Sequence, residues 1–274
     1  MKNIAFGQYY PAESVIHRMD PRAKIIMAIL YIICTFICKN AVGFFALTVV
    51  TVLMILLSRI PIKVVLASIK PLIFILLFTS LINVFATKGE RLLTPEAWVI
   101  KIYAEGLWNA LFMMLRIVAL LVSTGVFLSF TTTPIALTDA MEQLLSPLKR
   151  LRVPVHDVAM MTTIAMRFIP TLMEETEKIM NAQKSRGADF HSGSLIQRAK
   201  ALLPIFIPLL SSAFKRADEL ANAMDCRCYH GGEGRTKLKV LHLRGSDVVG
   251  MVLVLMFGVG IFFLNRVGLV YTMS

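Results

Sequence analysis

The sequence predicts an all-α, polytopic membrane protein with about five transmembrane helices and a further helical domain at or outside the bilayer surface. The 274-residue chain has a mean hydropathy of +0.70, and only 17% of its residues are charged, against about a quarter in a typical soluble domain. Five stretches carry no charge at all: residues 25–38, 40–58, 71–87, 117–138 and 248–265. A bilayer span takes roughly 17–25 apolar residues, so all but the first stretch are long enough to cross.

The first stretch is short and follows a helix-start signal. In "MDPRAK", Asp20 suits the N-cap and Pro21 suits the first helical position. Lys24 and Lys39 border the stretch, so we expect them to snorkel, or the helix to tilt or end shallowly. No apolar segment of the signal-peptide kind follows the first basic residue, and we expect this helix to be retained.

The fourth span is expected to begin near Gly106 and to carry one ionisable side chain, Arg116, at membrane depth. Such a side chain needs a partner or a polar cavity. Two cysteines, Cys34 and Cys38, lie one helical turn apart in the first span, and we interpret them as packing residues.

Basic residues predict the orientation of the chain. The net charge is +12, and Lys and Arg are in excess before the first span, between the second and third, and over residues 139–244. The positive-inside rule places these segments in the cytoplasm and the C-terminus outside. The expected divisions are a cytoplasmic N-terminal arm (1–24), transmembrane helices 1–4 (25–130), a large cytoplasmic domain (131–245) and a final span with the C-terminus (246–274). No aromatic-rich basic surface accompanies the charge, so no nucleic-acid partner is expected.

The domain at 131–245 is expected to contain two long helices. The first runs from about Val155 to Ser185 on helical apolar spacing, and Gly187 is a natural residue to end it. The second begins near Leu195 and contains a short apolar run with two prolines. That run is too short and too interrupted for a span, so we place it at the membrane surface.

These two helices end in similar sequences. "NAQKSRGADF" (181–190) and "NAMDCRCYHG" (222–231) share Asn-Ala-x-x-x-Arg, with Arg186 and Arg227 41 positions apart. "FIPTL" and "FIPLL" precede them in turn. The repeat suggests two arms with one task; chance similarity between two amphipathic helices is the alternative.

An arginine in the last turn of a helix is ordinarily explained by the helix dipole. The flanking residues here are small, Ser185 and Gly187 on one side of the repeat and Cys226 and Cys228 on the other, so a partner could approach the backbone closely. A guanidinium group also offers a fixed fork of donors to carboxylates or carbonyls. We therefore interpret both segments as docking ends for two equivalent or pseudo-equivalent partner subunits.

These residues resemble the transmembrane T component of energy-coupling factor (ECF) transporters, the vitamin and metal-ion importers of prokaryotes. The similarity covers nearly the whole length of the chain and includes "SVIHRMDPRAK", "RFIPTLMEETEKIMNAQKSRGADF" and "RADELANAMDCRCYHGG". The family carries two X-Arg-X motifs, often Ala-Arg-Gly, at the ends of two coupling helices. Here they correspond to Ser185-Arg186-Gly187 and Cys226-Arg227-Cys228. The second keeps only the arginine.

The resemblance implies that the two coupling helices cross in an X and dock into a dimer of ABC-type ATPases. It also implies a membrane-embedded, substrate-binding S component as the other partner, in the cell membrane of a prokaryote. The chain itself contains no G-x-x-x-x-G-K-[ST] phosphate loop. We therefore expect a non-catalytic subunit with no cofactor of its own. Its sequence does not specify which substrate the transporter carries.

Other functions are less well supported. Cys226-x-Cys228-x-His230 resembles part of a metal site but lacks a fourth ligand, and no metal is expected. A stand-alone secondary transporter or channel would place ionisable residues at the membrane midplane, where only Arg116 qualifies. A membrane-anchored enzyme would need an acid–base or metal constellation, and none is recognisable.

Overall fold

The computed structural model describes residues 9–87, 103–147, 154–188, 190, 194–231 and 242–267. These residues are predominantly helical and include no β-strand, which confirms the predicted all-α class. The chain divides into two compact units, a membrane unit (Met1–Ala140 and Val240–Ser274) and a coupling unit (Met141–Lys239).

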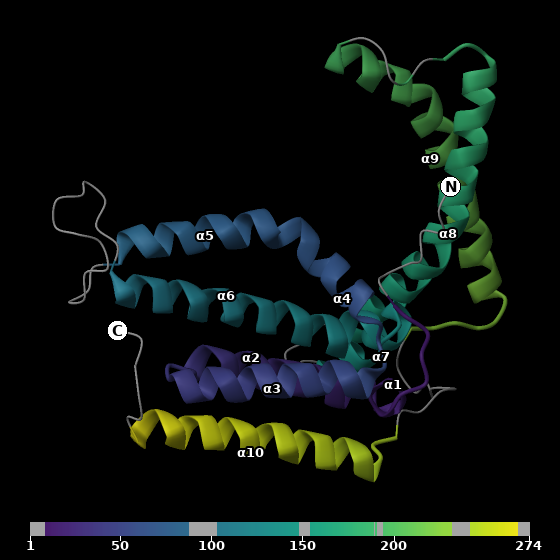
Figure 1. Cartoon of the computed structure of the whole chain (residues 1–274). Helices are drawn as coiled ribbons and strands as arrows, with labels where there is room; N and C mark the ends of the chain where they lie inside the picture. The colour runs from purple at the N-terminus through teal and green to yellow at the C-terminus, as the bar shows by residue number, and fades with distance from the viewer. Residues whose placement is uncertain are drawn as a thin grey trace. The chain divides into compact units, whose positions relative to one another are not determined.

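The membrane unit contains most of the helices (Figure 1). They are α1 (Val15–Arg18), α2 (Pro21–Ile37), α3 (Ala41–Ser58), α4 (Ile62–Ile69), the 3₁₀ turn η1 (Lys70–Leu72), α5 (Ile73–Ala86), α6 (Ala104–Thr124), the π-helical segment η2 (Gly125–Phe130) and α10 (Gly245–Val267). Helix α7 (Pro134–Leu144) leads into the coupling unit, which contains α8 (Val155–Ser185) and α9 (Leu195–Asp225).

Among the described residues, four helical segments are long and apolar enough to cross a bilayer: Ala41–Ser58, Ile62–Ala86, Ala104–Phe130 and Gly245–Arg266. The remaining expected span, the first in the sequence, is α2, which has 17 residues. Its helix is about 26 Å long, against roughly 30 Å of hydrocarbon. It packs against α10 and α6, and the five run side by side in Figure 1. The polytopic architecture predicted from the sequence is confirmed.

The third span begins earlier than its charge-free stretch suggests. It starts at Ile62 rather than at residue 71, because η1 carries the chain from α4 into α5 without a break. Pro71 lies in this 3₁₀ turn, and a proline is tolerated in the first turn of a helix. Lys63 and Lys70 consequently belong to the helix and not to a loop.

The core of the membrane unit is centred on α2. Tyr31 is fully buried, its hydroxyl donates to the Leu47 carbonyl at 3.1 Å, and it lies 2.6 Å from the Thr51 hydroxyl. At Gly258 of α10, an added Cβ would lie 2.6 Å from the sulfur of Cys34, so the glycine allows α10 to approach α2 closely. Cys34 and Cys38 are both buried, as their interpretation as packing residues requires.

Polar side chains close the C-terminal end of α2. Arg116 donates from Nη2 to the Cys38 carbonyl at 2.8 Å, and its guanidinium lies 5.2 Å from the centre of the Phe44 ring. A cation at a helix C-terminus is favoured by the helix dipole. Asn265 adds a second bond, donating from Nδ2 to the Ile37 carbonyl at 2.6 Å. Arg116 therefore has the partner that an ionisable side chain at membrane depth needs, in the Cys38 carbonyl at the C-terminal end of α2.

The N-terminal end of α2 is joined to the start of α10 by a buried carboxylate. Asp20 caps α2, and its side chain accepts from the Arg22 amide at 2.9 Å. The Asp20 amide donates to Oδ1 of Asp247 at 3.2 Å, and the Arg244 amide donates to Oδ2 of the same carboxylate at 2.7 Å. Asp247 is fully buried, so one side chain satisfies backbone donors at the starts of two helices.

Lys24 does not snorkel toward water. Its side chain is buried, and Nζ donates to the Thr131 carbonyl at 2.8 Å, just after η2, and to the Thr132 hydroxyl at 3.3 Å. Asp247 and Asp20 are close enough to interact with it electrostatically. The ammonium thus joins the start of α2 to the end of η2.

Asp247→Ala should lower the free energy of unfolding by about 2–4 kcal/mol, because it leaves the buried Asp20 amide and the part-buried Arg244 amide without an acceptor and removes the negative charge beside Lys24. The apparent melting midpoint in detergent, followed by size exclusion, measures this loss. The matched control is Ser246→Ala, at an exposed neighbouring position. Equal midpoints for the two variants would contradict the role assigned to Asp247.

Candidate docking site at the ends of α8 and α9

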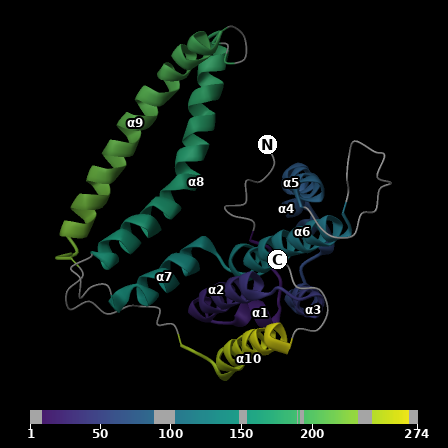
Figure 2. The same cartoon turned by 90° about the vertical axis from the view of Figure 1, so that its left-hand side faces the viewer.

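Helices α8 and α9 are each 31 residues long. They lie in contact, cross in the view of Figure 1, and run in opposite directions, so that their C-terminal ends lie at opposite ends of the pair (Figure 2). The bounds predicted for α8 and the start predicted for α9 are both confirmed. A capping box at Ser194 fixes that start, because Ser194 and Gln197 exchange side-chain-to-backbone hydrogen bonds.

A salt bridge joins the two helices. Arg216 Nη2 of α9 donates to Glu175 Oε2 of α8 at 3.1 Å, and both side chains are partly exposed. Glu175 precedes Arg186 by 11 residues, and Arg216 precedes Arg227 by 11 residues. We call Glu175–Arg186 the first arm and Arg216–Arg227 the second; each is about 16 Å long at helical rise. The sequence does not by itself pair Glu175 with Arg216, although the 41 residues between them equal the spacing of Arg186 and Arg227.

The first tip, which comprises Ser185, Arg186 and Gly187, ends α8 in a Schellman motif. The Gly187 amide donates to the Lys184 carbonyl at 2.9 Å, and the Ala188 amide donates to the Gln183 carbonyl at 3.0 Å. Gly187 has a φ of +86°, the left-handed conformation that this motif requires. Arg186 is thereby held as the last residue before the turn.

The second tip, which comprises Cys226, Arg227 and Cys228, ends α9 in the same way. The Cys228 amide donates to the Asp225 carbonyl at 2.9 Å, and the Tyr229 amide donates to the Met224 carbonyl at 3.1 Å. Cys228 takes the left-handed position with a φ of +56°. Arg227 therefore occupies the place that Arg186 has in the first tip, although the flanking residues differ.

All six tip residues are exposed. Within the described part of the chain, neither arginine side chain forms a salt bridge or a hydrogen bond. Each guanidinium therefore presents its donors away from the other described side chains, at the end of a helix whose backbone ends in a fixed turn. Such an arrangement can bind carboxylate or carbonyl acceptors on a partner.

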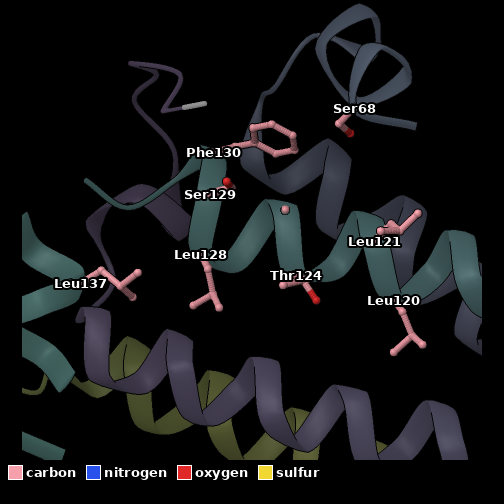
Figure 3. Close-up of a pocket in the computed structure, with 9 residues that line it drawn as sticks. Ser68, Leu120, Leu121, Thr124, Leu128, Ser129, Phe130 and Leu137 are labelled. Carbon is pink, nitrogen blue, oxygen red and sulfur yellow. The ribbon is translucent and has the colours of Figure 1, made fainter. Parts of the chain in front are cut away.

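No other described feature offers comparable chemistry. Among the described residues, no three His, Cys, Asp or Glu side chains gather closely enough to hold a metal ion. A pocket of ≈ 440 Å³ lies in the membrane unit beside η2 (Figure 3). Its lining is largely leucine, with the hydroxyls of Ser68, Thr124 and Ser129 and no charged side chain.

The two left-handed positions provide a matched test of the tip geometry. Gly187→Ala should destabilise the first tip and Cys228→Gly should stabilise the second, each by about 1 kcal/mol or roughly fivefold in local opening, because a side chain is disfavoured at positive φ. Nothing lies within 4 Å of a Cβ added at Gly187, so the effect there is one of backbone conformation. Amide hydrogen exchange at positions 187–188 and 228–229 measures it, and changes of the same sign at both tips would contradict the assignment.

The chain resembles known proteins over most of its length. Residues 12–238 match the family CbiQ, described as cobalt transport protein. A relative from Ruminiclostridium cellulolyticum is 50% identical over 250 residues (91% of this chain, 92% of the relative), and one from Bacillus subtilis is 44% identical over 265 residues (97% and 99%). A third, from Thermosediminibacter oceani, is 45% identical over 260 residues (95% and 97%). All three are called energy-coupling factor transporter transmembrane protein EcfT. The chain therefore belongs to the CbiQ family, as an EcfT-like transmembrane component of energy-coupling factor transporters.

Proposed function

We propose that this subunit couples ATP-driven motion of two ABC-type ATPase subunits to a membrane-embedded S component that binds vitamins or other micronutrients. The observation that carries the proposal is the equivalence of Arg186 and Arg227. Each lies at the end of a helix that closes with a Schellman motif, and each lies 11 residues after a member of the Glu175–Arg216 salt bridge. Each tip docks into a groove on one ATPase subunit.

The equivalence of the tips supports two equivalent partners. Two similar surfaces on one chain suit a dimer, or a pair of related subunits, whose symmetry repeats the same groove. Because the tips lie at opposite ends of the crossing pair (Figure 2), one groove cannot hold both. A charge-assisted hydrogen bond from each guanidinium to carboxylate or carbonyl oxygens contributes about 1.5–3 kcal/mol.

The site would lie on the cytoplasmic side of the cell membrane of a prokaryote, together with the N-terminus. The excess of Lys and Arg over residues 139–244 supports this orientation, and with it the division into segments 1–24, 25–130, 131–245 and 246–274. ATP is cytoplasmic, so the proposed ATPase partners require the tips to be on that side.

A stand-alone secondary transporter fits the described residues less well. A carrier site at membrane depth is expected to use ionisable side chains, whereas the pocket beside η2 is lined by apolar residues and hydroxyls. Arg116 is engaged by the end of α2 and by an aromatic ring.

Reversing both charges, Arg186→Glu with Arg227→Glu, should weaken retention of the ATPase pair by about a hundredfold or more, because two charge-assisted contacts become repulsive. Co-purification of the detergent-solubilised complex measures retention, and uptake of the substrate by cells should fall with it. The matched control is Lys178→Glu with Lys215→Glu, which makes the same two charge reversals at exposed positions of α8 and α9 away from the tips. Normal uptake in the arginine variant would overturn the docking assignment.

The salt bridge between the helices should affect coupling and not docking. Arg216→Glu places two acidic side chains together and removes an attraction worth up to about 1 kcal/mol, so uptake per ATP hydrolysed should fall while ATPase retention stays unchanged. The exchange of both residues, Glu175→Arg with Arg216→Glu, should restore uptake. If the double variant is as impaired as the single one, the pair does not act through its attraction.

A further inference from the structure

Two exposed thiols flank the docking arginine of the second tip. Cys226 and Cys228 are exposed, whereas Cys34 and Cys38 are buried in the membrane unit. The corresponding positions of the first tip are Ser185 and Gly187. A thiol reagent in solution can therefore modify one tip and leave its counterpart unchanged.

We propose that Cys226 and Cys228 form a reversible disulfide that prevents the second tip from docking. The inference rests on the docking function proposed above. In a helical turn, the α-carbons of residues two apart are about 5.4 Å from each other, within the usual range of about 4.4–6.8 Å for a disulfide. Hydrogen bonds from the Arg227 amide to the Met224 carbonyl (3.0 Å) and from the Cys228 amide to the Asp225 carbonyl (2.9 Å) hold this turn.

The bond requires a change in the backbone. Side chains two residues apart on a helix do not face each other, so the sulfurs meet only if one cysteine leaves its present conformation. Cys228 is the residue suited to this, because its φ of +56° is one that non-glycine residues rarely adopt. The backbone of the reduced tip is strained at Cys228. Release of that strain offsets part of the free energy needed to change the backbone when the disulfide forms.

Such a change disrupts the presentation of Arg227. The Schellman motif depends on the left-handed conformation of Cys228, since the bond from the Tyr229 amide to the Met224 carbonyl forms only there. Arg227 lies inside the ring that the disulfide would close, so its backbone changes with that of Cys228. Once that conformation is lost, Arg227 is no longer held in the geometry that Arg186 keeps at the first tip. The oxidised chain retains one docking tip of two.

The chemistry is thiol–disulfide exchange with a small disulfide. One thiolate attacks a sulfur of oxidised glutathione, which forms a mixed disulfide and releases one glutathione thiolate. The second thiolate attacks the chain sulfur of that mixed disulfide and releases the other. Two electrons pass from the cysteine pair to the small disulfide, and the two protons lost by the cysteines are taken up by the released thiolates. An excess of dithiol reductant reverses both steps. Disulfides that form in a reducing compartment are usually transient in this way.

The experiment uses the full-length chain in detergent with the ATPase pair, exposed to oxidised glutathione. We expect the intact mass to fall by the mass of two hydrogens, and a peptide with a bond between positions 226 and 228 to be found after digestion. Retention of the ATPase pair should weaken about tenfold, as for the loss of one charge-assisted contact. Dithiothreitol should restore both the mass and the retention.

The control converts the second tip into the sequence of the first. Cys226→Ser with Cys228→Gly removes both thiols, so its retention of the ATPase pair should be the same before and after exposure to oxidised glutathione. A glutathione adduct without an internal bond, or an internal bond that leaves retention unchanged, overturns the switch. If the reduced chain never retains an ATPase pair, the docking function fails and the switch fails with it, whereas the mass measurement still reports the cysteine chemistry by itself.

Discussion

Hydrogen bonding at the ends of helices is the constraint on which both units depend. In a bilayer, a helix satisfies its own backbone except in the first and last turns, and in the membrane unit side chains distant in sequence supply the missing partners. Asp247 accepts from the amides of Asp20 and Arg244, while Arg116 and Asn265 donate to carbonyls at the other end of α2. The short central helix is thus bonded at both ends to its neighbours, and ionisable groups at membrane depth have a structural explanation.

In the coupling unit the same constraint is satisfied locally, by Schellman motifs, and this has a functional consequence. Because the last carbonyls of α8 and α9 are occupied by backbone amides, the arginine side chains are not needed as caps and remain available to a partner. The motif requires a left-handed residue directly after each arginine. Glycine meets this requirement without strain at position 187, whereas cysteine meets it with strain at position 228. The second tip therefore differs from Ala-Arg-Gly in its side chains and in the strain at position 228, whereas its backbone geometry is the same as that of the first tip.

Features that depend on local sequence were predictable. The bounds of α8, the N-cap at Asp20 and the terminating role of Gly187 follow from capping rules. The bond between Asp20 and Asp247 joins residues 227 positions apart, and no local pattern reveals which buried carboxylate meets which helix. The expectation that Lys24 snorkels, or that its helix tilts or ends shallowly, considers one helix and a membrane, whereas the carbonyl after η2 gives the ammonium a nearer acceptor. The third span begins at Ile62, before its charge-free stretch, because Lys63 and Lys70 lie within the helix and a count of uncharged residues excludes them.

The placement of prolines relative to the salt bridge determines which parts of the coupling helices are stiff. Pro170 precedes Glu175, and Pro204 and Pro208 precede Arg216, so both arms are helices without proline. A proline within a helix removes a backbone hydrogen bond and permits bending. Each helix therefore consists of an uninterrupted segment between the salt bridge and the arginine, and a more easily bent segment before it. A displacement of either tip can therefore be transmitted along its arm as far as the salt bridge, and bending at the prolines, which lie before that point in the sequence, can absorb it.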